Sequence, residues 1–438
     1  MEKLKKFLFA LKGLFWKQKV QSALFALGFF LLLSNLFIFV SKNSLSMPFW
    51  DEWDVSQEVM KETNWIKIFL YQHNEHRIGV GLALAKTIAG LTNWSQAIEV
   101  KIVFLQIVFS CLFLLLVVRR LKRKIQVTDL VIPLVFFNTL QVGNILFPFQ
   151  LTFVFPLFFL FAGIFALTLK NLKVRNLLLV LFSLLSAFSS FHGLFVTLVF
   201  LTFLFLEFFR DGRSNFRIFV LTSLAEILVV VSYFLNYKNN LQTELNVRLG
   251  KKTLDFASTL SGGGFFFLDS SGRFLIFQYL ILLSIIFFLG WGMFYSFKNK
   301  NFSFVHAGFL ILLYAFLFLV SITIGRSSFG IGQALETRYL TFTMLFPLGI
   351  WLIASEFSKG RYLKIALFLF LALNIFVFSD RYHLMAQKNF ILTRRAWQCY
   401  QEKNQKDWQD CFNITPLYPD RARLESLLPD VLKFKKLR

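Results

Sequence analysis

The stretch VKIVFLQIVFSCLFLLLVVRRLKRK, residues 100–124, indicates the fold class of this chain. Residues 100–118 are predominantly apolar, and a helix of roughly 20 such residues is long enough to cross the hydrocarbon core of a bilayer. A cluster of arginines and lysines follows directly, within residues 119–124. Apolar segments that end in basic residues are typical of transmembrane helices, because cytoplasmic loops are enriched in lysine and arginine.

The same pattern recurs along the whole chain of 438 residues, of which 56% are hydrophobic and only 16% are charged. So few charged residues cannot cover the surface of an ordinary soluble domain. We therefore predict an all-α fold, a polytopic integral membrane protein with about 11 transmembrane helices. The predicted spans are 22–40, 100–118, 127–142, 150–168, 177–191, 193–209, 218–236, 274–296, 303–324, 339–355 and 365–379.

The net charge of +23 is distributed in a way that predicts the topology. In a soluble protein this charge would suggest nucleic acid, but here the basic residues lie in short clusters between apolar runs, so we expect no nucleic-acid partner. With a cytoplasmic N-terminus, every cluster falls on the cytoplasmic side of an inner membrane. The clusters are the basic residues within 3–19; Arg119, Arg120, Lys122, Arg123 and Lys124; Lys170, Lys173 and Arg175; Arg210, Arg213 and Arg217; Lys298 and Lys300; and Lys359, Arg361 and Lys364.

Three segments then lie on the outer side of the membrane: residues 41–99, 237–273 and 380–438. In the first of them, apolar positions recur at helical spacing between polar ones, which predicts helices that lie along the membrane surface. We expect residues 1–379 to form one transmembrane domain that includes this loop. The remaining residues would form a short extracytoplasmic C-terminal tail.

Two of the 3 cysteines lie in this tail. An oxidising compartment would favour a disulfide between Cys399 and Cys411, although two free thiols are equally compatible with the sequence. Cys111 lies in a predicted span, and we interpret it as a packing residue.

Three carboxylates follow the first predicted span within four positions, in the sequence PFWDEWD at residues 48–54. Aromatic residues on both sides hold this segment at the membrane interface, where acids are partly desolvated. Desolvation raises the pKa of a carboxyl group and suits it to accept a proton or to bind a metal. Asp51, Glu52 and Asp54 are therefore candidate catalytic residues, and Asp51 and Asp54 are candidate ligands of a divalent metal, Mg²⁺ or Mn²⁺. Alternatively, these acids only solvate the end of a helix.

A second polar group is the sequence QHNEHR at residues 72–77. On a helix, His73, His76 and Arg77 would share one face, because they are three and four residues apart. Two histidines at this spacing can bind zinc, but the zinc-protease pattern is absent, and we favour hydrogen bonding or phosphate binding by His76 and Arg77. His73, Glu75, His76 and Arg77 are candidate substrate-binding residues.

A third group spans the sequence GRSSFGIGQALETRY at residues 325–339. Arg326 and Arg338 flank a glycine-containing loop at the outer membrane edge, and Tyr339 follows. Two arginines at such a position can bind a phosphate bidentately, with help from backbone amides. The segment matches neither the Walker nor the dinucleotide-binding pattern. The alternative is a tight turn whose arginines extend to the lipid headgroups.

Polar residues also interrupt the outer ends of predicted spans, among them Asn144, Gln150 and His192. Some such residues make ordinary helix–helix contacts. All of them nevertheless gather at the same membrane face as the three polar groups, and one shared substrate-binding cleft is the simplest explanation.

These features resemble the GT-C superfamily of membrane glycosyltransferases, whose members have an acidic motif directly after the first helix and a first outer loop built of surface helices. The sequences DEWD (51–54) and HNEHR (73–77), together with residues 144–150 and 326–339, are similar to segments of poorly characterised bacterial members. The resemblance in topology covers nearly the whole chain. Only the acidic motif belongs to the general pattern of the superfamily.

The resemblance implies an enzyme that transfers a sugar from a polyprenyl-phosphate donor to an extracytoplasmic glycan or lipid acceptor. By position, the family's catalytic carboxylate corresponds to Asp51, Glu52 or Asp54, of which we favour Asp51. We expect direct displacement with inversion, in which the carboxylate removes the proton of the acceptor and Arg326, Arg338 or Arg77 neutralises the leaving phosphate. The motif WWDYG of oligosaccharyltransferases is absent, which argues against protein N-glycosylation.

Two other classes of protein remain open. A flippase or transporter for a lipid-linked glycan would also need arginines and a polar cleft, but such folds often contain paired repeats, and the sequence shows none. An O-antigen polymerase or ligase is also polytopic with outer arginines, although its chemistry relies on arginine and histidine and not on an acidic motif after the first helix.

Overall fold

The computed structural model describes residues 18–45, 47–122, 124–211, 216–238, 250–265, 273–357, 361–403 and 407–436. Within these ranges the fold is all-α apart from one short β-hairpin, which confirms the predicted fold class. Several predicted features lie outside the described residues, namely the basic residues before position 18, Arg123, Arg213, Lys359 and parts of the outer segment 237–273.

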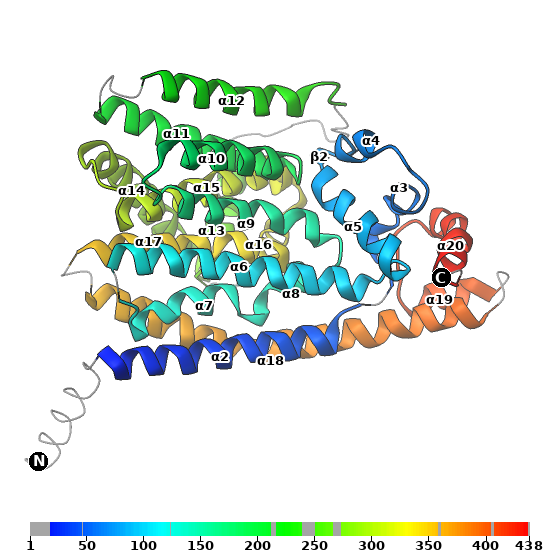
Figure 1. Ribbon diagram of the computed structural model, residues 1–438. Helices are drawn as coiled ribbons and strands as arrows, with labels where there is room; N and C mark the ends of the chain where they lie inside the picture. The colour runs from blue at the N-terminus through cyan, green and yellow to red at the C-terminus, as the bar shows by residue number, and fades with distance from the viewer. Residues whose placement is uncertain are drawn as a thin grey trace, which may run out of the picture.

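Eight helical segments in the described part of the chain are long and apolar enough to cross a membrane, as expected of a helical membrane protein. They coincide with eight of the predicted spans, and they pack side by side into a bundle (Figure 1). Their helices are α2 (Gln18–Asn43), α6 (Gln96–Lys122), α11 (Leu194–Asp211), α12 (Phe216–Phe234), α14 (Leu275–Lys298), α15 (Phe304–Arg326), the pair α16 (Thr337–Thr343) and α17 (Leu345–Glu356), and α18 (Arg361–Glu402).

Two further predicted spans correspond to helices that are too short to cross alone. Helix α9 (Gln150–Ala166) has 17 residues and α10 (Leu172–Ala187) has 16. At about 1.5 Å per residue, such helices are shorter than a hydrocarbon core of roughly 30 Å. Twelve side chains of α9 are buried, so surrounding helices shield its ends from lipid. Short helices within a membrane are tolerated under that condition.

The prediction of one continuous helix over residues 127–142 is wrong. The amide of Asn138 is the local cause, since its oxygen accepts a hydrogen bond from the Leu140 N–H at 3.1 Å while its nitrogen donates to the carbonyl of Val135 at 2.6 Å. This side chain ends one helix and begins the next. The segment consists of η2 (Val127–Leu130), α7 (Val131–Phe136), η3 (Thr139–Gln141) and α8 (Val142–Ile145).

Residues 41–99, the predicted first outer loop, contain short helices. The longest is α5 (Gly79–Thr92). The expectation of a helix over residues 72–77 is wrong, because this segment is an antiparallel hairpin in which His73 pairs with His76. Asn74 has a positive φ of 49°, which closes the turn. The other elements are η1 (Trp50–Glu52), α3 (Ser56–Met60), α4 (Trp65–Phe69), β1 (Gln72–His73) and β2 (His76–Arg77).

The C-terminal tail is not separate from the rest of the protein. Helix α18 runs through position 380 without a break, so the predicted domain boundary lies inside a helix. Beyond it, α19 (Trp408–Ile414) and α20 (Arg421–Lys436) pack beside the first outer loop (Figure 1). We call the apolar cluster that these segments share the outer core; its fully buried members include Trp53, Ile68, Cys411, Leu417, Leu424 and Val431.

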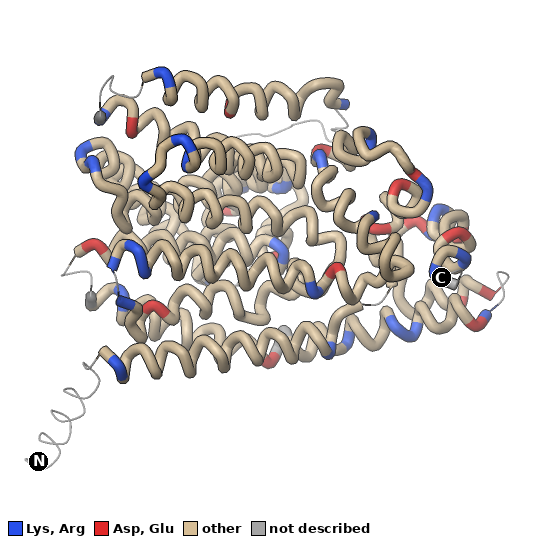
Figure 2. The backbone as a smooth tube through the Cα atoms, in the orientation of Figure 1, with Lys and Arg blue, Asp and Glu red and all other residues tan. Residues whose placement is uncertain are grey.

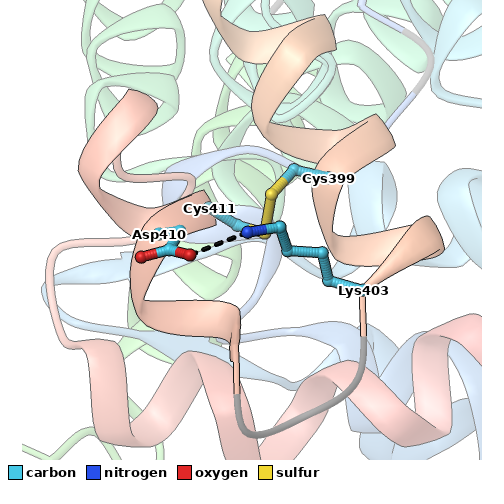
Figure 3. The surroundings of a disulfide bond; sticks show 4 residues. All are labelled: Cys399, Lys403, Asp410 and Cys411. Atoms are coloured by element: carbon cyan, nitrogen blue, oxygen red, sulfur yellow. Dashed lines mark hydrogen bonds and ion pairs between the residues drawn. A yellow bond between two sulfur atoms is a disulfide. The ribbon is translucent and has the colours of Figure 1, made fainter.

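A disulfide between Cys399 and Cys411 joins the end of α18 to α19, which decides between the two alternatives that the sequence leaves open. The ammonium group of Lys403 lies 2.7 Å from the carboxylate of Asp410 next to this bond (Figure 3). The disulfide therefore fixes the return of the chain toward the outer loop. Cys111 is buried within α6, in agreement with a packing role.

The remaining described helices complete the bundle. Helix α13 (Lys251–Gly263) packs against α14, α15 and α16. Three 3₁₀ helices connect longer ones, namely η4 (Phe191–Gly193), η6 (Ser327–Phe329) and η7 (Ile331–Leu335).

The end of the bundle that lies away from the outer core, which we call the basic end, carries lysines and arginines at several helix ends. Figure 2 shows basic residues near the outer core as well. The C-terminal ends of α6, α11 and α14 carry Lys122, Arg210 and Lys298, and these helix ends lie opposite α5, α19 and α20 (Figure 2). The guanidinium of Arg210 donates to the carbonyl of Asn299 at 2.7 Å, which joins two of these ends. The charge clusters of the sequence predict a cytoplasmic location for that end.

Cysteine labelling tests this topology. We expect Thr63→Cys, at an exposed position of the first outer loop, to react with a membrane-impermeant maleimide in intact cells. Lys300→Cys, at an exposed position of the basic end, should react only after permeabilisation. Background labelling should be low, because Cys111 is buried and the other two cysteines are bonded. Labelling of Lys300→Cys in intact cells would contradict the topology.

Candidate functional site

The acidic motif lies on η1 and the turn that follows it, beyond the end of α2. The backbone N–H of Phe49 donates to Oε2 of Glu52 at 3.0 Å, and Trp53 is fully buried in the outer core. Trp50 adopts a positive φ of 53°, and its N–H donates to the carbonyl of Leu417 at 2.8 Å. Contacts on both sides of Asp51 therefore hold the turn in place.

Asp51 and Asp54 face His73 of the hairpin. One ligand atom from each of these residues lies within 4.8 Å of the others. Two carboxylate oxygens suit Mg²⁺ or Mn²⁺, and an imidazole is a common ligand of transition metals. The donor set therefore fits a divalent metal such as Mn²⁺, with His73 added to the two acids that the sequence singled out.

Charges around Asp51 affect its protonation. Burial raises the pKa of Asp51, and the neighbouring Asp54 raises it further, while His73, Arg338 and Arg326 oppose this effect. These contributions show that the two arginines lie within electrostatic range of the acidic motif. A carboxyl group with a raised pKa accepts a proton more readily than an ordinary aspartate.

His76 is neutral in this setting. Burial lowers its pKa to about 3, and His73, Arg326 and Arg338 contribute in the same direction. Its Nδ1 accepts a hydrogen bond from the N–H of Phe191 at 3.1 Å, so we assign the proton to Nε2. That nitrogen lies 3.4 Å from Glu75 and can donate to it.

Glu75 connects the hairpin to the end of α15. Its carboxylate lies 3.5 Å from the guanidinium of Arg326, and both side chains are partly exposed. The hydroxyl groups of Tyr233 and Tyr237 donate to the backbone carbonyl of Glu75 at 2.9 and 3.0 Å. The hairpin therefore holds Arg326 beside the acidic motif.

Arg338 is exposed at the start of α16, and α8 fixes its position. The amide of Asn144 donates to the carbonyl of Arg338 at 2.6 Å and to the hydroxyl of Thr341 at 2.7 Å. A side chain at Gly143 would come within 2.8 Å of the Arg338 nitrogen, so only glycine allows this close approach. Asn144, a predicted substrate-binding residue, thus supports Arg338 from within the protein.

Arg77 and His192 also make contacts within the protein. The Nε of Arg77 donates to the carbonyl of Tyr233 at 2.7 Å, and its other two nitrogens donate to the carbonyls of Leu70 and Leu235. His192 is buried, and its Nε2 lies 3.0 Å from the carbonyl of Phe153. These hydrogen bonds use polar groups of both side chains. We therefore assign structural roles to Arg77 and His192.

Gln150 and Tyr339, the remaining predicted substrate-binding residues, lie near the starts of helices. Gln150 is the first residue of α9 and is half-buried. Tyr339 is buried in α16, where its ring meets Phe318 edge-on and its hydroxyl lies 3.4 Å from the amide nitrogen of Gln333. Neither position adds a charge to the site.

Glu52 belongs to a buried network that the sequence did not predict. Its carboxyl lies beside that of Glu99 in α6 and near Lys435 of α20, and burial and Glu99 raise the pKa of Glu52 well above its usual range. Burial lowers the pKa of Lys435 to about 8, and its ammonium donates to Gln96 at 2.7 Å. A small cavity lined by Glu52 and Glu99 adjoins this network. Glu52 is thus a poor candidate for contact with substrate.

The fold and the site define a polytopic α-helical membrane protein with a polar site at one end of its bundle. That site combines Asp51, Asp54 and His73 with two arginines from separate segments of the chain. Comparison of the chain with known protein families, with characterised proteins and with solved structures finds no match.

Metal binding at the site can be measured by thermal unfolding. A ligand that binds only the folded state at 100 times its Kd stabilises that state by about 2.7 kcal/mol. We expect Mn²⁺ to raise the melting temperature of the wild type by several degrees, and this shift should vanish in Asp54→Asn and His73→Gln. Glu62→Gln, an acid of the same loop outside the group, should keep the shift. A wild type that Mn²⁺ does not stabilise would contradict the metal site.

Proposed function

We propose that this protein is a membrane glycosyltransferase of the GT-C type, which transfers a sugar from a polyprenyl-phosphate donor to a glycan or lipid acceptor outside the cytoplasm. The observation that carries this proposal is the group of Asp51, Asp54 and His73, together with the hairpin residue Glu75, whose carboxylate lies 3.5 Å from Arg326. The charges of Arg326 and Arg338 also act on Asp51. A base and two phosphate-binding cations are the groups that this transfer needs.

In the proposed reaction, Asp51 removes the proton of an acceptor hydroxyl while the hydroxyl oxygen attacks the anomeric carbon of the sugar. The bond between that carbon and the phosphate oxygen breaks as the new glycosidic bond forms, so the configuration inverts. The proton ends on Asp51, and the leaving group departs as a polyprenyl phosphate. An acceptor hydroxyl is a poor nucleophile, which is why a positioned base matters.

The phosphate gains negative charge as it leaves, and cations that are already in place stabilise this charge. Arg326 and Arg338 fill this role in the proposal. A divalent metal held by Asp51, Asp54 and His73 would add a positive charge at the phosphate. A bound metal would lower the pKa of Asp51, so the raised pKa belongs to the metal-free site. One oxygen of Asp51 would ligate the metal, and the other would take the acceptor proton.

The proposed topology places this site at the level of the lipid headgroups on the outer side of an inner membrane. Arg338 lies at the start of the segment Thr337–Glu356, which is long and apolar enough to cross a membrane. A polyprenyl donor in the outer leaflet would present its phosphate at the same depth. The basic end of the bundle supports a cytoplasmic location for the opposite side.

Transport of a lipid-linked glycan is a second candidate function, and Glu226 favours it. This residue lies in α12, and its carboxyl group is fully buried beside Ser183. Acidic residues inside transmembrane helices often belong to ion or proton pathways of transporters.

Replacing Asp51 tests the transferase directly. Asp51→Asn keeps the shape of the side chain and removes the base, so we expect the rate of sugar transfer to fall about 10²–10⁴-fold. Without added divalent metal, the wild-type rate should also decline as the pH falls through the raised pKa of Asp51, because the base is then protonated. Transfer from radiolabelled polyprenyl-phosphate sugar into purified acceptor measures both effects.

Two variants serve as controls for that measurement. Asp430→Asn, which removes an exposed carboxylate paired with Lys61, should keep the wild-type rate. Glu226→Gln should also keep it if the protein is a transferase, whereas a transporter should lose lipid translocation in vesicles with this variant. Full transfer activity in Asp51→Asn would exclude Asp51 as the base.

The phosphate role of Arg338 depends on its planar guanidinium. Arg338→Lys keeps the charge but loses the bidentate geometry. Hydrogen bonds to charged groups contribute about 1.5–3 kcal/mol, so we expect the KM for the donor to rise roughly 10- to 100-fold. Arg421→Lys, at a surface pair with Glu425, is the matched control. An unchanged donor KM in Arg338→Lys would assign Arg338 a structural role.

A further inference from the structure

The C-terminal segment 407–436 contacts the acidic motif on both sides of Asp51. On one side, the carbonyl of Leu417 accepts a hydrogen bond from the Trp50 N–H at 2.8 Å. On the other side, Asp54 binds two side chains of this segment. The sequence analysis treated this segment only as a tail.

The contacts of Asp54 with the segment are specific. The hydroxyl of Tyr418 donates to Oδ1 of Asp54 at 2.7 Å, and the guanidinium of Arg423 lies 2.7 Å from the same oxygen. Because both contacts end on Oδ1, the other oxygen of Asp54 is left for the group that it forms with Asp51 and His73.

The three acids of the motif therefore differ in their surroundings. Glu52 is buried and accepts a hydrogen bond from Phe49, and Asp54 is held by Tyr418 and Arg423. Among the described residues, the carboxylate of Asp51 has no hydrogen-bond or ion-pair partner. The C-terminal segment thus constrains the residues around Asp51 and leaves Asp51 itself available.

We propose that Tyr418 and Arg423 are positioning residues of the active site, which hold Asp54 in the orientation that completes the group with Asp51 and His73. This inference rests on the proposed glycosyltransferase function. The disulfide between Cys399 and Cys411 ties this segment to α18, and the outer core packs it against the first outer loop. The active site is then incomplete without the C-terminal segment.

A general stabilising role for the Arg423 pair is the competing explanation. The side chain of Arg423 is 51% exposed and that of Asp54 is 15% exposed. Because the guanidinium side of this pair is exposed, solvent screens it, and the pair contributes less to the stability of the protein than a fully buried pair would. Loss of this pair should therefore leave global stability nearly unchanged and act locally on the acidic motif.

Hydrogen–deuterium exchange on the full-length protein tests the positioning without any assumption about the reaction. In the double variant Tyr418→Phe/Arg423→Gln, we expect exchange of the backbone amides of residues 49–55 to increase roughly threefold or more, with an unchanged melting temperature. The double variant Arg421→Gln/Glu425→Gln removes another ion pair of α20 and should leave this exchange unchanged. Unchanged exchange of the motif in the first variant would overturn the proposal.

The sugar-transfer assay tests the consequence for catalysis. Misplacement of a catalytic group by about 1 Å can cost roughly 100-fold in rate, so we expect kcat of the Tyr418→Phe/Arg423→Gln variant to fall at least tenfold while the donor KM stays within about twofold. The single variant Arg423→Lys should keep most of the wild-type kcat, because it keeps a positive charge beside Asp54. A wild-type kcat in the double variant would overturn the proposal even if exchange increases.

The two measurements also separate this inference from the proposed function. If the wild type transfers no sugar from any polyprenyl-phosphate donor, the proposed function fails, and the exchange experiment still decides whether Tyr418 and Arg423 hold the motif. If the wild type is active and exchange of the motif is the same in all variants, only the positioning role fails.

Discussion

The outer core is the packing arrangement on which the candidate site depends. Trp53 lies fully buried in it, between two acids of the site, and the cluster joins the first outer loop to a segment more than 300 residues later in the sequence. Loss of a large aromatic side chain from a core typically costs about 3–5 kcal/mol. Such burial fixes the turn of residues 50–54, because rotating Trp53 out of the core would expose it to water or lipid headgroups.

Around this fixed turn, the other charged groups are placed by separate pieces of the bundle. The hairpin that carries His73 also carries Glu75, which holds Arg326 at 3.5 Å. Helix α8 approaches Arg338 closely enough that position 143 requires a glycine, and Asn144 binds the backbone of Arg338. The electrostatic result is a carboxyl group, Asp51, whose pKa is raised by burial and on which the charges of two arginines act in the opposite direction. The proposed transfer uses both parts, since the acceptor must lose a proton and the phosphate must leave with more charge.

Much of the bundle could be predicted from the sequence, because a long run of apolar residues is itself the signal of a membrane-spanning helix. The prediction failed where a single polar side chain changes the backbone, as Asn138 does between α7 and α8. It failed again at residues 72–77, where the spacing of His73 and His76 fits a helix but Asn74 closes a hairpin. The acidic motif could be identified from its place after the first helix. Its partners Arg423 and Lys435 could not, because residues distant in the sequence leave no local pattern.

The position of a bound polyprenyl phosphate tests the proposed site most directly. A cryo-electron microscopy structure of the wild-type protein with a polyprenyl monophosphate would show which residues bind the headgroup. The proposed site predicts that the phosphate lies between Arg326 and Arg338, within reach of a metal ion on Asp51, Asp54 and His73. A phosphate bound at the basic end of the bundle, away from Asp51, would contradict it.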